Sequence, residues 1–440
     1  MQGYFLFLVW LALLLLGLRA PFVFGLGYIW IDLFTPQYVN PGLMSSFPLS
    51  MLMGAGAVFG YLLADRRYPP RLQAGILLPL AWAGWITLTT TWAVVPDAAW
   101  GKWSWAYKTV LFSAFMPFMF RSRVQIEAAV LVIILSITAH AIPFGTKTAL
   151  TGGGYERQLG LLQINSALGE SITLAVDCVA ILPPLAWLYR HGRIVPSFVA
   201  RARVRALGHL GVAGFAVLTT LGTYARAGLV SLGIFAAFHW WGSKRKLPLA
   251  AAFLVLAVAL AALMGQRYAA RMSTIADPTH EQSASTRLAV WTWTWNFARE
   301  NPFGGGFEAY RTNTLEFMVG DRASEEHGRA FHSMYFEVLG EQGFPGVAIF
   351  AAMMATFFAG GWRLMRRAAG LAELDWMAAL AKAMLIAGCA YFAGTTFIGV
   401  AFQPFHYYLF ALTVSLRNHY ARAVTDGQLA APPAAVPARA

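Results

Sequence analysis

The residues best suited to chemistry lie in or beside one polar interval. This interval, residues 265–343, is the only long polar stretch in an otherwise hydrophobic chain, and it contains His332 and Arg287. Arg226 lies upstream of it, within an apolar segment. A guanidinium group binds anions through its charge and paired N–H groups, and a neutral imidazole accepts protons near neutral pH. We therefore predict a site in which the two arginines bind an anion and His332 acts as a general base.

Arg226 is predicted to face a polar cavity or to lie near the outer surface between two membrane spans. It is the only arginine or lysine between Leu210 and Trp241, and an arginine that faces lipid costs about 3 kcal/mol or more. The alternative is an arginine at a helix end whose side chain extends to the membrane surface. Tyr224 lies just upstream and is a candidate for a substrate contact.

Arg287 is predicted to lie in the first turn of a helix over residues 286–299, with Ser285 as its N-cap. The helix dipole disfavours a cation there, so another interaction must hold the arginine. An anion bound jointly by Arg287 and the free amides of the helix end would explain this placement. A surface ion pair with Glu281 is the alternative. Trp291 and Trp295 share one face of the helix and are predicted to anchor it in the lipid interface, with stacking on sugar rings as the alternative.

His332 is predicted to lie at the start of a short helix that Gly343 ends. The helix dipole and the nearby arginines disfavour the cationic imidazole, which therefore stays neutral and basic. The alternative is a histidine that only hydrogen-bonds the loop. The same cavity has four further candidate lining residues, for which solvation of loops is the simpler interpretation: Lys147, Arg157, Gln163 and Asn165.

Metal binding is the competing chemistry for this loop. His327 and His332 with Glu325 and Glu326 are possible ligands. Their spacing matches no helical zinc pattern such as His-Glu-x-x-His. We therefore predict neither a bound metal nor a cofactor.

The composition indicates a polytopic membrane protein. Of the 440 residues, 58% are hydrophobic and only 12% are charged, whereas charged residues make up about a quarter of a soluble domain. The net charge of +13 comes mostly from short connectors between apolar runs, which is the pattern of membrane topology and argues against nucleic-acid binding. Cys178 and Cys389 each lie in an apolar run and are interpreted as packing residues.

The apolar runs predict an all-α fold with 12 or 13 transmembrane helices, because a backbone in lipid must satisfy its own hydrogen bonds. We divide the chain into transmembrane helices over 1–264, a partly helical outer loop over 265–343, more transmembrane helices over 344–416 and a disordered cytoplasmic tail over 417–440. The side of the N-terminus depends on the number of spans. Few strands are expected, and residues 321–329 are expected to be mobile. The spans are predicted near 4–18, 20–36, 45–64, 73–95, 105–120, 126–145, 167–189, 210–225, 227–241, 247–264, 344–364, 376–396 and 404–416.

Several segments resemble the O-antigen ligase, O-antigen polymerase and protein O-oligosaccharyltransferase superfamily. Residues 224–228, Tyr-Ala-Arg-Ala-Gly, resemble its Ser-Arg-small-Gly motif, although Ala225 replaces the usual serine. Three further segments resemble the other parts of the family's sequence signature. They are Thr286-Arg287, the turn over 301–307, and His332-Ser333 followed by residues 339–346. The resemblance covers roughly residues 159–350. The first half agrees with the family only in hydropathy.

The resemblance implies a membrane glycosyltransferase with the GT-C-like architecture of about twelve helices. Such an enzyme would move a glycan from undecaprenyl diphosphate to the lipid A core oligosaccharide at the periplasmic face of a Gram-negative inner membrane. Arg226 and Arg287 would bind the diphosphate, and His332 would deprotonate the acceptor hydroxyl in a metal-independent, inverting displacement. A polymerase or a protein glycosyltransferase is the alternative within the family, and a lipid flippase or secondary transporter is the alternative outside it. We expect the loop to be mobile without donor and Arg226 to be in place already.

Overall fold

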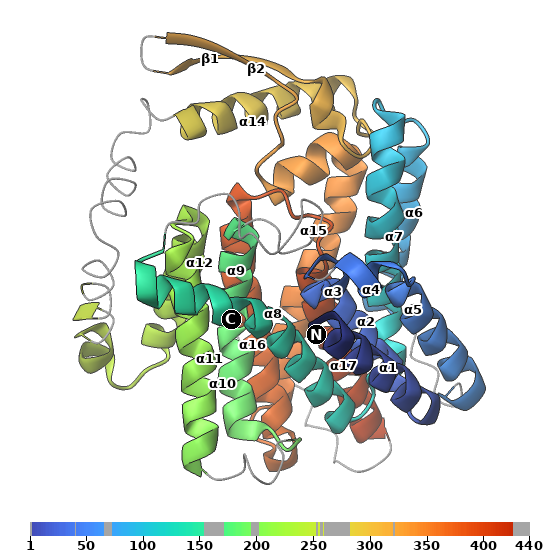
Figure 1. Ribbon diagram of the computed structural model, residues 1–440, viewed down its shortest axis with the longest axis vertical. Helices are drawn as coiled ribbons and strands as arrows, with labels where there is room; N and C mark the ends of the chain where they lie inside the picture. Colours follow the sequence, from blue (N-terminus) through green and yellow to red (C-terminus); the bar gives the residue numbers. More distant parts are fainter. Residues whose placement is uncertain are drawn as a thin grey trace, which may run out of the picture.

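The computed structural model describes residues 2–39, 41–65, 73–153, 171–194, 202–251, 254, 255, 258, 282–319 and 322–425. The first half is helical (Figure 1), with α1 (Gln2–Arg19), α2 (Phe22–Phe34), α3 (Pro36–Val39), α4 (Pro41–Ser45), α5 (Leu49–Gly60), η1 (Tyr61–Asp65), α6 (Ala74–Thr90), α7 (Pro96–Met119) and α8 (Arg123–Thr151). The second half continues with α9 (Ser171–Ala180), α10 (Leu182–His191), α11 (Ala202–Gly222), α12 (Arg226–Trp241), α14 (Gln282–Glu300), η3 (Ala309–Thr312), β1 (Thr314–Val319), β2 (Arg322–His327), α15 (Met334–Ala368), η4 (Ala372–Leu374), α16 (Asp375–Gly394), η5 (Thr395–Phe397) and α17 (Pro404–Thr425).

The described helices confirm a mostly α-helical membrane protein. Five of them are long and apolar enough to cross a membrane, namely those over 123–151, 171–191, 202–222, 334–368 and 372–397. Four shorter apolar helices lie over 3–19, 22–34, 49–64 and 74–90. The number of twelve or thirteen spans stays a prediction, and most of the span predicted over 247–264 lies outside the described residues.

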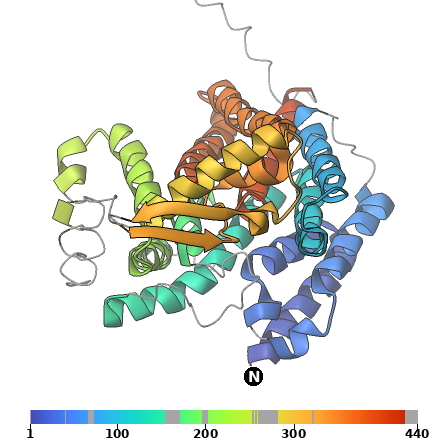
Figure 2. The same cartoon turned by 90° about the horizontal axis from the view of Figure 1, so that it is seen from above.

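One end of the helix bundle carries a small domain of its own. Figure 1 shows α14 lying across the upper end of the bundle with the β1–β2 hairpin above it, and Figure 2 shows both from above. A separate hydrophobic cluster joins α14 to β1 and to the segment before α15 through Val290, Ala309, Leu315 and Phe331. We call residues 282–333 the loop domain. This cluster gives the loop domain a small core of its own.

The loop domain differs from the sequence predictions in its strands. Residues 321–329 were expected to be mobile, but β2 over 322–327 pairs antiparallel with β1, with Thr314 opposite His327. The base of the hairpin is closed by Asn313, whose side chain accepts from the backbone N–H of Arg329 at 2.9 Å and donates to its carbonyl oxygen at 2.7 Å. Ala323 is the only apolar residue of β2, so the segment lacks the apolar alternation that marks a strand in a sequence.

Two predicted helix boundaries are also wrong. Helix α14 begins at Gln282, so Ser285 lies inside it and does not cap it. Arg287 is therefore beyond the first turn, and the free amides of the helix end do not lie beside it. Helix α17 continues to Thr425, into the tail predicted to be disordered from residue 417. Residues 426–440 lie outside the described part of the chain.

Helix α15 bends sharply at Gly343, where the sequence predicts a helix end. Gly343 has φ 64° and ψ −169°. Its neighbour Phe344 donates its N–H to the carbonyl of Pro302 at 2.9 Å instead of continuing the helix. The carbonyl of Gly340 accepts the backbone N–H of residue 305 at 3.0 Å. The carbonyl of Glu341 accepts the backbone N–H of residue 306 at 2.9 Å. The turn over 302–306 thus satisfies the backbone groups that the bend releases.

We expect Gly343→Ala to destabilise the protein strongly. A Cβ atom at this position would lie 2.3 Å from the carbonyl oxygen of Pro302 and 2.4 Å from the amide nitrogen of Gly304. The positive φ angle adds about 1–3 kcal/mol of backbone strain. The expected result is a clear fall in the midpoint of thermal unfolding in detergent, measured against Gly370→Ala. Gly370 also has a positive φ, 84°, but no atom lies within 4 Å of the position that its Cβ would take, so equal losses in the two variants would contradict the packing argument.

Candidate active site

His332 lies at the end of the loop domain, where the chain enters α15. It directly precedes Ser333, the N-cap residue of α15, and its backbone has φ 47°. Positive φ angles are uncommon outside glycine, although histidine adopts them more often than most residues. The neighbouring side chains of Phe331 and Ser333 are buried, whereas His332 itself is partly exposed. The imidazole is thus less buried than the side chains on either side of it.

The electrostatic environment keeps His332 neutral. Burial, and after it the positive charges of Arg329 and Arg287, together lower the pKa of the imidazole to about 4, against a smaller opposing effect of Glu326. The charge of Arg287 thus acts on His332, and so does that of Arg329. The side chain of Arg329 pairs with Glu326 at 3.2 Å. Sequence reasoning missed Arg329 because its approach depends on the hairpin.

Arg287 is carried to this place by the packing of α14 on α15. The ring of Trp291 stacks on Phe336 with centroids 5.0 Å apart and an interplanar angle of 4°. Its Nε1–H donates to the carbonyl of Phe331 at 3.0 Å, directly beside His332. Trp291 thus packs against α15, and the anchoring role predicted for it in the lipid interface stays a prediction. Trp291 fixes α14, and with it Arg287, relative to the histidine.

Arg226 is the first residue of α12, immediately after the break between α11 and α12. The break is built by Tyr224, which has φ 53° and whose hydroxyl donates to the carbonyl of Gly152 at 2.8 Å. Thr223 Oγ1 donates to the carbonyl of Thr220 at 2.7 Å. Tyr224 is buried, and its hydroxyl group joins the turn between α11 and α12 to the C-terminal end of α8. The substrate contact suggested for Tyr224 stays a prediction.

The Arg226 turn and the His332 segment pack on the same end of α16. Ala227, the residue after Arg226, packs against Gly394 at the end of α16. A Cβ atom placed on Gly394 would lie 3.2 Å from the carbonyl oxygen of Ala227. In the first turn of α15, the hydroxyl of Tyr335 donates to the carbonyl of Phe392 at 3.0 Å. The short helix η5, which follows α16, contacts both α12 and α15. Arg226 and His332 therefore lie at one end of the bundle, the end that the loop domain covers.

The remaining predicted lining residues are only partly described. Lys147 is exposed in the last turns of α8. The C-cap residue of this helix, Gly152, accepts the hydrogen bond from the Tyr224 hydroxyl. Arg157, Gln163 and Asn165 lie outside the described residues. Within the described part of the chain, no group of three His, Cys, Asp or Glu side chains forms a metal site. His327 pairs with Glu325 at 3.4 Å on the exposed hairpin instead.

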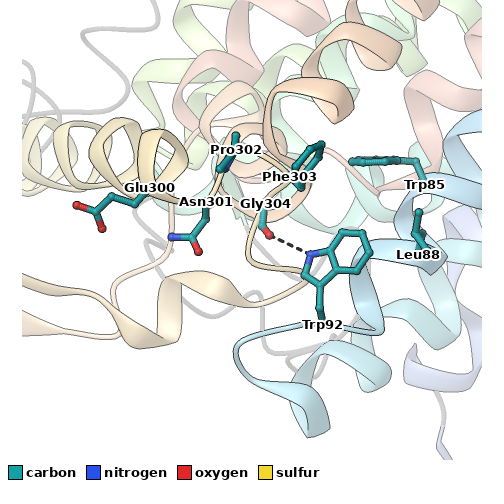
Figure 3. A pocket seen from close by; sticks show the side chains of 8 residues that line it. All are labelled: Trp85, Leu88, Trp92, Glu300, Asn301, Pro302, Phe303 and Gly304. Carbon is teal, nitrogen blue, oxygen red and sulfur yellow. Dashed lines mark hydrogen bonds between the residues drawn. The ribbon is translucent and has the colours of Figure 1, made fainter.

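A distinct pocket lies at the other end of α14. It has a volume of about 540 Å³ and is lined by Trp85, Leu88, Trp92, Glu300, Asn301, Pro302, Phe303 and Gly304 (Figure 3). The indole N–H of Trp92 donates to the carbonyl of Gly304 at 3.2 Å. At 1.5 Å per residue, Glu300 is about 20 Å along the helix from Arg287. No basic residue lines this pocket, so it lacks the positive charges that act on His332.

We expect His332 to titrate well below the ordinary range of a histidine. Its pKa of about 4 means that the imidazole is neutral above pH 5 and gains its proton only in more acidic solution. Arg329→Ala removes a nearby positive charge and should raise this pKa toward 6.5. NMR of histidine-labelled protein in detergent, with His332→Ala to assign the signal, measures both values. A wild-type signal that titrates near 6.5 would show that the imidazole is not held as the structure has it.

Comparison with known protein families matches two parts of the chain to different families. Residues 211–351 match the family described as O-antigen ligase, and this range contains Arg226, Arg287, Arg329 and His332. Residues 1–193 match a family of unknown function (DUF5935). No curated protein matches the chain. The first match supports the resemblance to the O-antigen ligase and polymerase superfamily, whose members are glycosyltransferase-like enzymes.

Proposed function

We propose that the protein is a metal-independent, inverting glycosyltransferase of the O-antigen ligase type. It takes a glycan from undecaprenyl diphosphate and transfers it to a sugar hydroxyl of the lipid A core, at the periplasmic face of a Gram-negative inner membrane. The observation that carries the proposal is the convergence of His332 with Arg287 and Arg329 within the region matched by the O-antigen ligase family.

The arginines supply what the donor requires. When the bond between the sugar and the diphosphate breaks, negative charge develops on the phosphate oxygen that leaves. Guanidinium groups stabilise that charge through bidentate hydrogen bonds without needing a metal ion. Arg287 and Arg226 bind the diphosphate in this proposal, and Arg329 adds positive charge beside His332. Lys147, Arg157, Gln163, Asn165 and Tyr224 remain candidate contacts to the substrates.

His332 completes a single displacement. Its neutral imidazole accepts the proton of the acceptor hydroxyl as the acceptor oxygen attacks the anomeric carbon, and the diphosphate departs from the opposite face. One C–O bond forms between the acceptor oxygen and the anomeric carbon, and the C–O bond from that carbon to the phosphate oxygen breaks. Because the attack comes from the face opposite the leaving group, the anomeric configuration inverts. A base with a pKa near 4 is weak, but a bound diphosphate offsets the charges of Arg287 and Arg329 and raises the pKa of His332. Donor binding thereby makes the histidine a better base.

The decisive experiment supplies the purified protein with undecaprenyl-diphosphate-linked glycan and separate acceptors. A lipid A core acceptor that gains the glycan supports a ligase. Transfer to a second lipid-linked glycan would instead identify a polymerase, and transfer to a serine or threonine would identify a protein glycosyltransferase. Movement of intact lipid-linked glycan across a vesicle membrane without any new glycosidic bond would point to a flippase. Activity that disappears in a chelator and returns with a divalent ion would contradict the metal-independent mechanism.

A further inference from the structure

A buried ammonium group lies beneath the loop domain and contacts three carboxylates. Lys102, near the start of α7, has a side chain that is 11% exposed. Its Nζ donates to Oε1 of Glu337 at 2.6 Å and to Oε1 of Glu341 at 2.8 Å, and it lies 3.8 Å from Oε1 of Glu308. We call these four residues the Lys102 cluster. The sequence analysis singled out none of them as a site residue.

Each carboxylate of the Lys102 cluster also holds a different part of the chain. Glu341 accepts the backbone N–H of Glu308 at 2.9 Å, and Glu337 accepts the backbone N–H of Ala401 at 2.8 Å. Glu308, which has φ 62°, accepts the guanidinium Nε–H of Arg311 at 2.8 Å. The cluster therefore links α7, the turn that follows α14, the start of α15 and the loop between α16 and α17.

The part of α15 held by the cluster is the part that follows His332. Glu337 and Glu341 lie between the beginning of α15 and its bend at Gly343. The backbone N–H of Glu337 donates to the carbonyl of Ser333 at 2.8 Å, which closes the first helical turn after the histidine. A shift of Glu337 therefore moves the peptide next to His332. This connects the ammonium of Lys102 to the histidine through one turn of helix.

Charge balance in the cluster depends on Lys102. The side chain of Glu341 is fully buried and that of Glu337 is 7% exposed. Arg311 approaches only Glu308 and has a side chain that is 54% exposed. Removing one partner of a buried ion pair is strongly destabilising, because it leaves an uncompensated charge in a medium of low polarity. Without Lys102, the buried side chains of Glu337 and Glu341 would lose the hydrogen-bond donor that they share, and with it the link from α15 to α7.

We propose that Lys102 is a positioning residue that holds His332 in place through Glu337 and the first turn of α15. The inference rests on the proposed glycosyl transfer, in which His332 is the base. Lys102 does not touch the reacting atoms. Its role is to keep the imidazole at a fixed distance from Arg287 and Arg329 while the donor and acceptor bind.

A double-mutant cycle tests this role. Lys102→Met is expected to lower kcat about 100-fold, since a displacement of about 1 Å can cost that much, and to leave the KM for the donor within about twofold. Lys102→Arg, which retains the charge, should restore most of the activity. In a His332→Ala background, Lys102→Met should have almost no further effect, because both changes remove the same catalytic step. If Lys102→Met lowered kcat in the His332→Ala background by the same factor as in the wild type, the two effects would be independent and the proposal would be overturned.

A matched control removes the other cation that contacts the cluster. Arg311→Met deletes an exposed partner of Glu308 and should leave kcat near that of the wild type. If Lys102→Met does not fold, Lys102→Met combined with Glu341→Gln removes one negative charge and keeps an acceptor for the Glu308 N–H. That double variant should fold and still show the loss of kcat. Wild-type kcat in either folded Lys102 variant would overturn the proposal.

A readout that needs no turnover separates this inference from the proposed function. In Lys102→Met, a displaced His332 moves away from Arg287 and Arg329, so its NMR titration should rise from about 4 toward the ordinary value. Arg311→Met should leave the titration unchanged. If the wild-type protein transfers no glycan, the proposed function fails while this shift still shows that Lys102 positions His332. An unchanged titration in Lys102→Met would refute the positioning role whatever the enzyme's activity.

Discussion

Replacing His332 with alanine is expected to lower kcat for glycan transfer by about 10²–10⁴-fold, the usual contribution of a positioned general base. The imidazole is the group next to Arg287 and Arg329 that can accept the acceptor's proton, and its lowered pKa keeps it neutral at working pH. The measurement is the initial rate of glycan transfer by protein reconstituted in lipid, at matched expression.

The backbone at His332 requires a second variant. Alanine tolerates φ 47° poorly, so His332→Ala combines loss of the base with backbone strain. Asparagine adopts positive φ more readily, and His332→Asn should keep the fold while it loses the base. His327→Ala on the exposed hairpin is the matched control and should retain wild-type activity. Near-normal transfer by folded His332→Asn would remove this histidine from the mechanism.

Replacing Arg226 with alanine is expected to lower kcat/KM about 10²–10³-fold, comparable to the loss of one donor that stabilises developing negative charge. Arg226→Lys should recover only part of this, because an ammonium group keeps the charge but not the paired N–H geometry. Rates and donor affinity, measured with the same lipid-linked glycan, separate binding from catalysis. An effect on KM alone would assign Arg226 to ground-state binding of the diphosphate.

The control for Arg226 is an arginine at the far end of a membrane helix. Arg363 is exposed near the end of α15, and its Nε donates to the carbonyl of Ala359 at 3.1 Å. Arg363→Ala should leave transfer unchanged. If Arg226→Ala is as active as Arg363→Ala, the diphosphate is bound without Arg226. In that case Arg287 and Arg329 must carry the leaving-group charge.

The parts of the fold that the sequence predicted are those encoded by local patterns. Long apolar runs located α12 and α16 closely, and the glycine at 343 predicted the break in α15. The β1–β2 hairpin was missed because β2 has a polar sequence without apolar alternation and gains stability from its pairing with β1. Arg329 was missed because its placement depends on this hairpin, and Lys102 was missed because its partners lie far away in the sequence. A contact such as Lys102 to Glu341 depends on how helices pack, which spacing alone does not reveal.

The Lys102 cluster also constrains how the chain can evolve. Lys102 lies in the region matched by one family, residues 1–193, whereas Glu308, Glu337 and Glu341 lie in the region matched by the other, residues 211–351. A recombination event between these regions would pair a lysine from one parent with carboxylates from another. Hybrids should therefore fold and function only when both parents carry the same charge arrangement. The two halves are expected to be inherited together as a single unit.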